Sequence, residues 1–315
     1  MYNKELSFKF DKDFTPTQEY LKSMPDLSDG DIQGSKVNIE RVGISNFHLP
    51  LQIRTKEGGT QELEASIVGT VSLEGVKKGI NMSRIIRTFY EYKNDVFSID
   101  ILGRILQDYR TKLGSYDADI IISFRYRIWQ ESLRSVDENG EKNGGWQYYN
   151  VSFEANINKA GVFSKTIHFD FVYSSTCPCS TDLSLHAMET RNQYATPHSQ
   201  RSVMRASIKF EEFLWIEDIY QMMLKALKTE TQVFVKREDE QAFAELNAAN
   251  TKFVEDAVRL VFFEFIQNSK ILDFKLIASH NESLHSHDAI AVITAGLFGG
   301  FDDKVTPSEL KSLLY

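Results

Sequence analysis

Apolar and polar residues alternate along the chain from about residue 47, which is the pattern of a half-buried β-strand. The alternation covers 49–53, stops at two glycines at 58–59, and returns over 63–71. Two alternating runs joined by a glycine-containing turn are typical of a hairpin. The sequence therefore predicts a β-hairpin here, preceded over 1–40 by a polar, irregular arm.

The period then lengthens to that of amphipathic helices, in which apolar residues recur every three or four positions. Two such stripes occupy 85–90 and 102–113, and Gly114 after the second is a typical helix stop. Strand-like alternation resumes over 120–128 and 149–155. The predicted order is strand, strand, helix, helix, strand, strand.

The second half of the chain repeats this order. Its strand and helix patterns lie at 167–173, 202–210, 216–227, 253–265, 274–278 and 288–295. A long polar loop over 174–202 separates its first two strands, and a loop of this length in a compact unit is usually functional or disordered.

We therefore predict an α+β fold of two units in tandem, each an antiparallel four-stranded sheet with two helices on one face, ββααββ twice. The units span 41–158 and 159–300, and a tail covers 301–315. Within the tail, TPSEL predicts a capping box with Thr306 as N-cap and Glu309 at N3.

Composition narrows the class of protein. The 315 residues are 42% hydrophobic and 25% charged, which excludes a mainly disordered chain. The net charge of −8 argues against general nucleic-acid binding. Neither a membrane-spanning apolar run nor the apolar core of a secretory signal is present in the sequence. Because the only cysteines, Cys177 and Cys179, are two positions apart, we expect reduced thiols in the cytoplasm.

The 174–202 loop holds both cysteines and two histidines. Cys177 or Cys179 together with His198 has the chemistry of a zinc or iron site, and equally that of a Cys–His nucleophile pair. Exposed and inert thiols are the third interpretation, and spacing alone leaves all three open.

Two further clusters are rich in charge or histidine, KREDE at 236–240 and HNESLHSHDA at 280–289. Such runs are commonly solvated surface. Glu255 begins a predicted helix, where an ion pair with Arg259 is the alternative to a binding role.

A phosphate site is the last candidate, at KKGINMSR (77–84), directly before the first predicted helix. Basic side chains and the free N–H groups of a helix start suit a phosphate. The alternative is that Asn81 is an ordinary N-cap.

Seven segments, in this order, resemble the type IB GTP cyclohydrolases, the bacterial FolE2-like family. They are IERVGI at 39–44, KGINMSR at 78–84, TCPCS at 176–180, HSQRS at 198–202, KREDE at 236–240, FVEDAVR at 253–259 and ESLHSHDA at 282–289. The ordered set covers most of residues 38–297 and is more specific than any one segment.

The resemblance implies the tunnelling fold, in which two ββααββ units stand in tandem. It also implies hydrolysis of GTP to 7,8-dihydroneopterin triphosphate and formate, the first step of folate biosynthesis. A homo-oligomer is implied too, a tetramer being expected, with active sites at subunit interfaces. Neither a nucleic acid nor a membrane is an expected partner.

The resemblance also implies a ligand set for one divalent metal, with Cys177, His198 and Glu240 at the family's ligand positions. Sulfur, nitrogen and oxygen ligands together leave zinc, manganese and iron(II) all possible. His186 in LSLHAM is a rival for the histidine position, but only HSQRS matches the family motif. Asn81 replaces the histidine common in the family, which puts a substrate or packing contact in doubt.

The remaining roles follow the same matches. Cys177, Cys179 and His285 match catalytic positions, and Glu255 matches the residue that anchors guanine. A carboxylate accepts hydrogen bonds from guanine N1–H and its 2-amino group, a pair that adenine lacks. We expect the triphosphate to be held by Lys78, Ser83, Arg84 and Arg201.

Three alternatives stay open beside this function. An archaeal-type GTP cyclohydrolase would release a cyclic-phosphate product. A nitrile reductase of the same fold would use a cysteine nucleophile and NADPH. A non-catalytic pterin- or nucleotide-binding module would have lost motif residues.

Overall fold

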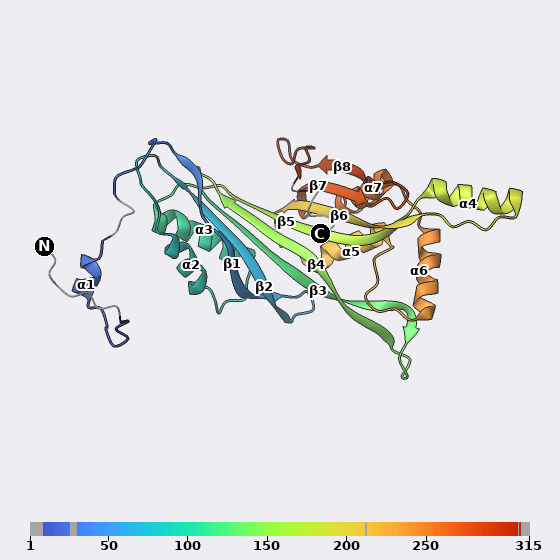
Figure 1. Cartoon of the computed structure of the whole chain (residues 1–315), viewed down its shortest axis with the longest axis horizontal. Helices are drawn as coiled ribbons and strands as arrows, with labels where there is room; N and C mark the ends of the chain where they lie inside the picture. Colours follow the sequence, from blue (N-terminus) through green and yellow to red (C-terminus); the bar gives the residue numbers. More distant parts are fainter. Residues whose placement is uncertain (1–8, 26–29, 212, 308, 310–315) are drawn as a thin grey trace.

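The computed structural model describes residues 9–25, 30–211, 213–307 and 309, and it centres on one antiparallel sheet (Figure 1). Eight strands cross the sheet in chain order, so each pairs with its neighbours in sequence. They are β1 (Ile39–Arg54), β2 (Thr60–Leu73), β3 (Ala118–Val136), β4 (Lys142–Ile157), β5 (Phe163–Thr176), β6 (Ser199–Phe210), β7 (Ile271–His280) and β8 (Ala289–Ala295). Parts of the predicted arm (1–8 and 26–29) and tail (308 and 310–315) lie outside the described residues.

Helices cover one face of this sheet. They are α2 (Met82–Glu91) and α3 (Ile99–Leu113) in the first half, and α5 (Ile216–Leu227), α6 (Arg237–Ala249) and α7 (Val254–Phe265) in the second. Two more, α1 (Gln18–Ser23) and α4 (Pro178–Arg191), lie outside this layer (Figure 1). Among the described helices, none combines the length and apolar character needed to cross a bilayer.

The hydrophobic core lies between the sheet and the helices because strand side chains alternate between its two faces. In β3, Ile120 and Ile122 are fully buried, whereas Ile121 between them is exposed. Helices α2 and α3 pack on the first four strands, and α5 and α7 pack on the last four. Most of the buried apolar residues form one continuous cluster across both halves, so the two halves share a main core, and Val203 and Ile277 form a small second cluster.

The first half confirms the predicted order of two strands, two helices and two strands. The β1–β2 hairpin turns at Gly58, whose φ of +93° glycine adopts without steric strain because it has no Cβ. Helix α3 ends as predicted at Gly114, which has left-handed backbone geometry. The first strand is longer than predicted, since β1 starts at Ile39 and includes the segment assigned to the arm's end.

The second half departs from ββααββ. Its order is β5, α4, β6, then α5, α6 and α7, then β7 and β8. The strands of the two predicted units are joined in one sheet, because β4 and β5 pair. The KREDE segment, which belongs to no strand or helix of the predicted order, is the N-terminus of α6, with Lys236 as its N-cap residue.

The 174–202 segment is likewise not a loop. It contains the end of β5, helix α4 and the start of β6. Pro178 occupies the first turn of α4, where proline needs no N–H partner, and Asn192 ends the helix with left-handed geometry. Only Ser184 and Ala187 of α4 are buried, so no apolar stripe marked it in the sequence.

The arm contains a helix that was not predicted, whereas the tail has the capping box that was. Helix α1 interrupts the arm, and the Thr17 hydroxyl caps it by accepting from the Tyr20 N–H. The capping box in the tail is confirmed: the Thr306 N–H donates to Glu309 Oε2 (2.7 Å), and the Glu309 N–H donates to Thr306 Oγ1 (3.3 Å).

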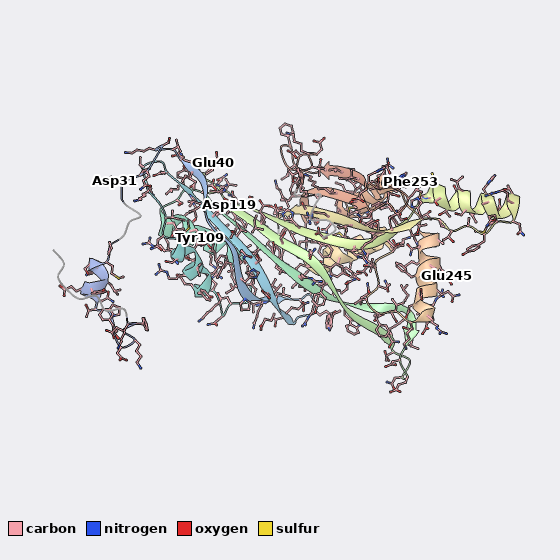
Figure 2. All side chains as sticks on the ribbon, viewed as in Figure 1. Asp31, Glu40, Tyr109, Asp119, Glu245 and Phe253 are labelled. Atoms are coloured by element: carbon pink, nitrogen blue, oxygen red, sulfur yellow. The ribbon has the colours of Figure 1, made fainter. Side chains whose placement is uncertain are left out.

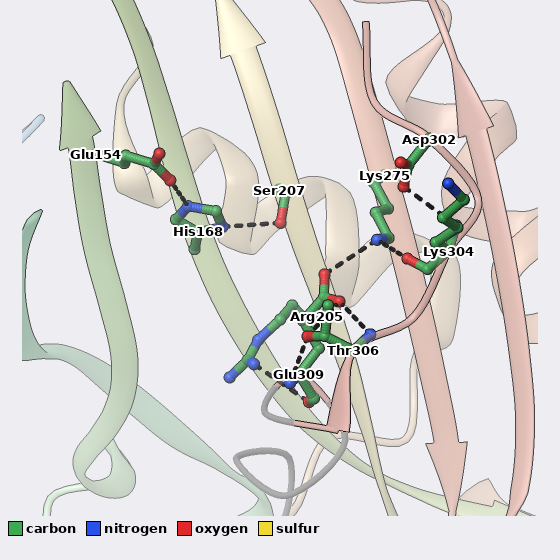
Figure 3. A network of polar contacts seen from close by, with 9 residues as sticks. All are labelled: Glu154, His168, Arg205, Ser207, Lys275, Asp302, Lys304, Thr306 and Glu309. Atoms are coloured by element: carbon green, nitrogen blue, oxygen red, sulfur yellow. Dashed lines mark hydrogen bonds and ion pairs between the residues drawn. The ribbon is translucent and has the colours of Figure 1, made fainter. Parts of the chain in front are cut away.

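The same tail lies on the sheet face opposite the helices, beside β6 and β7 (Figure 3). Lys275 Nζ donates to Glu309 Oε1 (3.0 Å) and to the Lys304 carbonyl. Arg205 on β6 holds Asp170 through two nitrogens, at 2.7 and 2.6 Å, and also donates to the Glu309 carbonyl. These contacts attach the tail to the second half of the sheet.

Candidate metal and nucleotide site

The end of the β5–β6 ladder brings Cys177 and His198 together. The last paired residues are Thr176 and Ser199, so Cys177 and His198 are one position further out on each strand. The Cys177 N–H donates to the His198 carbonyl at 3.2 Å, which continues the pairing by one step. Two residues that are 21 positions apart in sequence are therefore neighbours.

Cys177 is also the N-cap residue of α4, and Cys179 lies in the first turn of that helix. Cys177 is half-buried and Cys179 is exposed, and neither forms a disulfide. His186, the rival histidine, lies further along α4 and is exposed. Its side chain therefore sits on the helix that leads away from the Cys177–His198 pair.

The His198 ring is held on its Nδ1 side. Nδ1 lies 2.9 Å from Gln200 Oε1 and 3.5 Å from Glu282 Oε2. The His198 N–H also donates to Ser180 Oγ, in the first turn of α4, at 3.2 Å. Across the described chain, Nε2 of this ring has no hydrogen-bond partner.

The ESLHSHDA loop reaches the same place through Glu282. It joins β7 to β8, and its ends are tied by Asn281 Nδ2 donating to Asp288 Oδ1 (3.0 Å). His285 lies in this loop, exposed, with its ring stacked on that of His287 at a centroid distance of 4.8 Å. The loop therefore carries an exposed imidazole on the side of the sheet end where His198 lies.

The start of α7 is anchored to this strand end as well. The Lys252 N–H donates to the Thr176 carbonyl (3.2 Å), one residue before Cys177. Glu255 follows in the first turn of α7, exposed, and its carboxylate makes no hydrogen bond or ion pair with any described residue. The predicted alternative, an ion pair between Glu255 and Arg259, is wrong, because Arg259 pairs with Asp256 (3.2 Å) instead.

Glu240 is not beside the cysteine–histidine pair in a single chain. Its neighbour Asp239 accepts from the N–H groups of Arg134 and Ser135, which fixes the start of α6 to the end of β3. Burial alone would raise the pKa of Asp239, but these hydrogen bonds lower it below its usual range. The far end of α6, nine residues on at Ala249, leads to Lys252, so about 14 Å of helix separates Glu240 from that end.

Among the residues that the structure describes, no three His, Cys, Asp or Glu side chains gather as a metal site. Within its described residues, one chain therefore supplies Cys177 and His198 in one place and does not add a third such ligand. Thiol and imidazole groups fit zinc or iron, but a complete cation site needs a further donor.

The predicted triphosphate residues fall into two places. Lys78, Ser83 and Arg84 are exposed around the start of α2, whereas Arg201 is on β6, near Cys177. Figure 1 shows α2 and α4 at opposite ends of the molecule. In Figure 2, Tyr109 of α3 and Phe253 before α7 mark the same two ends.

The start of α2 also differs in detail from the N-cap alternative. Asn81 holds the N-cap position but makes no side-chain cap hydrogen bond. Its Oδ1 accepts instead from Ser83 Oγ at 2.6 Å, and Arg84 Nη1 donates to the Lys112 carbonyl at 2.6 Å. Lys78 remains an exposed cation at this helix start.

A buried polar cluster behind Cys177 was not predicted. Tyr173 and His280 are fully buried, and the tyrosine hydroxyl lies 2.8 Å from His280 Nε2. Lys252 Nζ donates to Thr229 Oγ1 (3.2 Å) and to the Asn250 carbonyl (2.6 Å). Burial lowers the pKa of Lys252 to about 8, and burial with the Lys252 charge lowers the pKa of His280 to about 4. The only sequence signal was His280 at the start of a histidine-rich segment.

A buried carboxylic acid, Glu230, lies between the halves of the sheet. Glu230 accepts hydrogen bonds from the hydroxyls of Tyr149 on β4 and Tyr220 on α5. Burial raises the pKa of Glu230 to about 7. This carboxyl links the first half to the second and bears on stability rather than on the predicted chemistry.

The fold and the site define an antiparallel α+β protein in which a cysteine and a histidine are paired through their backbones at a strand–helix junction. The chain belongs to the type I GTP cyclohydrolase FolE2 family, whose model matches residues 24–291. It is 50% identical over 295 residues to the GTP cyclohydrolase FolE2 of Paracoccus denitrificans (strain Pd 1222), covering 92% of this chain and 90% of that protein. The FolE2 protein of Cereibacter sphaeroides (strain KD131 / KCTC 12085) is also 50% identical, over 93% of this chain and 81% of its own length.

Among solved structures, the uricase of Arthrobacter globiformis is similar, with a TM-score of 0.49. It is 10% identical in sequence, and the match covers 87% of this chain and 98% of the uricase chain.

Proposed function

We propose that the protein is a metal-dependent GTP cyclohydrolase of type IB, which converts GTP and water to 7,8-dihydroneopterin triphosphate and formate. The observation that carries this proposal is the pairing of Cys177 with His198 at the end of β5 and β6. The start of α7, with Glu255, and the loop of His285 are attached to the same strand end. Membership of the FolE2 family supports the choice of substrate.

Cys177, His198 and Glu240 are the proposed holders of one divalent cation, with zinc, manganese and iron(II) as candidates. When bound, such a cation lowers the pKa of a coordinated water toward about 7 and so supplies a hydroxide near neutral pH. Because Glu240 is one helix length from the pair within a chain, we infer that a second chain completes the ligand set.

The other side chains act on the nucleotide itself. The free carboxylate of Glu255 accepts from guanine N1–H and the 2-amino group, which selects guanine over adenine. His285 and Cys179 are exposed near the same end and are the proposed donors of protons to the opening imidazole ring. Arg201 and the Lys78, Ser83 and Arg84 group, supplied by different chains, hold the triphosphate.

A homo-oligomer, with a tetramer expected, is part of this proposal, as is the tunnelling fold. The outer edges of β1 and β8 lack a paired strand in the described chain, and such edges are usually covered. Helix α4 also exposes Leu183, Leu185 and Met188, as expected for a helix that packs on another subunit. Light scattering that gave a monomer would contradict the shared site. The free thiols suit a reducing cytoplasm.

The direct test supplies GTP to the oligomer loaded with Zn²⁺, Mn²⁺ or Fe²⁺ in turn. We expect formate, and after oxidation a fluorescent pterin, from at least one of the three. A cyclic-phosphate product in the mass spectrum would favour the archaeal-type reaction, and a requirement for NADPH would favour the reductase. No turnover of GTP with any metal would overturn the proposal.

The matched control pair lies on α6. Glu238 and Glu240 are both exposed acids in its first turn. Glu240→Gln should lose metal and turnover, whereas Glu238→Gln should keep both. Equal losses in the two variants would show that helix charge, and not metal ligation, explains the effect.

A further inference from the structure

The two ring nitrogens of His198 are in different surroundings, and this difference decides which of them is free to bind. A neutral imidazole carries one proton, so one nitrogen donates a hydrogen bond and the other offers a lone pair. We propose that Gln200 and Glu282 are positioning residues that keep the proton of His198 on Nδ1, so that Nε2 presents its lone pair to the metal. This inference rests on the proposed role of His198 as a ligand.

The side-chain amide of Gln200 is held in one orientation by its other neighbours. The side chain is 8% exposed, and Nε2 donates to Ser175 Oγ at 2.8 Å. Ser175 and Ser202 are both fully buried, and their hydroxyl oxygens lie 2.7 Å apart. With its N–H₂ directed at Ser175, the amide turns its oxygen to His198 Nδ1 at 2.9 Å. An amide oxygen accepts only, so Nδ1 donates.

Glu282 closes the alternative in which the amide of Gln200 is reversed. The Ser175 hydroxyl could then donate to the amide oxygen, and the amide nitrogen would donate to a bare Nδ1. That lone pair would face the Glu282 carboxylate, 3.5 Å from Nδ1. The side chains of His198 and Glu282 are only 16% and 14% exposed, so water screens this repulsion weakly. Both neighbours of Nδ1 therefore favour a proton there.

His168 provides an internal comparison with the opposite arrangement (Figure 3). Its Nε2 lies 3.3 Å from the carboxylate of Glu154, and its Nδ1 lies 2.8 Å from the Ser207 hydroxyl. A carboxylate can only accept and a hydroxyl can donate, so the neutral ring carries its proton on Nε2. The same chain thus holds two histidines with opposite expected tautomers.

The experiment reads both tautomers in the assembled, metal-free protein, labelled with ¹⁵N in its histidine rings. At about pH 8, above the ordinary imidazole pKa of about 6.5, ring nitrogen shifts distinguish a protonated nitrogen from a bare one. Loss of signals in His198→Asn and His168→Asn assigns the two rings. We expect a protonated Nδ1 in His198 and a protonated Nε2 in His168.

Two variants then separate positioning from packing. The double variant Gln200→Met with Glu282→Met keeps approximate side-chain size but removes both oxygen acceptors near Nδ1, so the His198 proton should distribute over both nitrogens. Gln200→Glu keeps an acceptor at the same place and should keep the Nδ1 proton. Co²⁺ affinity, followed by its thiolate charge-transfer absorption, should fall about 10- to 100-fold in the double variant and stay near wild type in Gln200→Glu.

A protonated Nε2 in wild-type His198 would overturn the inference without any variant. An unchanged tautomer in a folded double variant would overturn it too, because Gln200 and Glu282 would then be packing residues only. The proposed function fails separately: a protonated Nδ1 with no GTP turnover contradicts the reaction, whereas turnover with a protonated Nε2 contradicts this inference.

Discussion

Each half of the sheet contains two hairpins, and the halves differ in how those hairpins are closed. In the first half, β1 and β2 are joined by a short turn in which the Thr55 N–H donates to the Gly59 carbonyl, and 137–141 joins β3 to β4. In the second half, the matching connections are helix α4, between Cys177 and His198, and the loop of Glu282 and His285. The sheet is duplicated, while both cysteines, His198 and His285 lie in the hairpin connections of only one copy.

A repeated sheet can gain functional side chains in the connections between its strands without losing stability. In both halves the hairpin connections lie at the same end of the strands. An enlarged connection therefore adds side chains at that end without changing the pairing of the strands. The main hydrophobic core, between the sheet and the helices, continues through both halves. The predictions below test whether chemistry and stability are divided between the halves in this way.

The largest expected effect comes from removing the thiol at the enlarged connection. Cys177→Ala should lose bound metal and lower GTP turnover by at least about 1000-fold, because the water then loses its activation. Glu57→Ala, in the equivalent turn of the first half, should leave metal content and turnover unchanged. Metal analysis and formate release measure both, and metal retained in Cys177→Ala would refute the ligand assignment.

The next effect concerns the shared core. Leu102 in α3 and Leu227 in α5 are both fully buried, one in each half. Each change to alanine should lower the free energy of unfolding by about 2–5 kcal/mol through lost burial and a cavity. Because the core is continuous, both should shift one cooperative transition in chemical denaturation. Separate transitions for the two halves would contradict a single core.

A pH effect should arise at Glu230, between the halves. Its pKa is about 7 in the folded chain, against 4.5 for the ordinary group, so folding favours the neutral acid. Its contribution to stability is complete below about pH 4.5 and is lost as pH rises through 7, by up to about 3 kcal/mol. Glu230→Gln should remove this fall between pH 5 and 8.

Denaturant unfolding of wild type and Glu230→Gln at several pH values measures the difference. Glu238→Gln, on the exposed start of α6, is the matched control and should follow the wild-type curve. If Glu230→Gln also followed that curve, the buried carboxyl would be ionised in the folded protein across this range.

The smallest effect concerns the tail, which has no counterpart in the first half. Glu309→Gln weakens the pairing with Lys275, which is 6% exposed, and should cost about 1 kcal/mol of stability. The loss should shrink at high salt, as expected for a partly exposed ion pair. GTP turnover should not change, and a large fall in turnover would assign the tail to the site.

The sequence predicted the elements that bury one face, because burial leaves a period in the chain. Helices α2, α3, α5 and α7 were found from their apolar stripes. Helices α4 and α6 were missed since each buries a single apolar side chain, Ala187 in α4 and Ala242 in α6. A mostly exposed helix has no strong hydrophobic period to read.

The candidate site was predictable to the same limited extent. Family motifs indicated Cys177 and His198, and strand pairing brings these two together. The contacts of Gln200 with Ser175, and of Tyr173 with His280, join distant segments and leave no local pattern. Nor does the sequence reveal that α6 places Glu240 away from its expected partners, because that depends on where the helix begins.

The length of α6 has a thermodynamic consequence under the proposed ligand set. If Glu240 reaches the Cys177–His198 pair only from another subunit, assembly and cation uptake become linked equilibria. The cation then tightens the assembly, and the assembly tightens the hold on the cation, by the same factor. Diluting the enzyme below the dissociation constant of its assembly should release metal, so starvation for the ion would dismantle the complex.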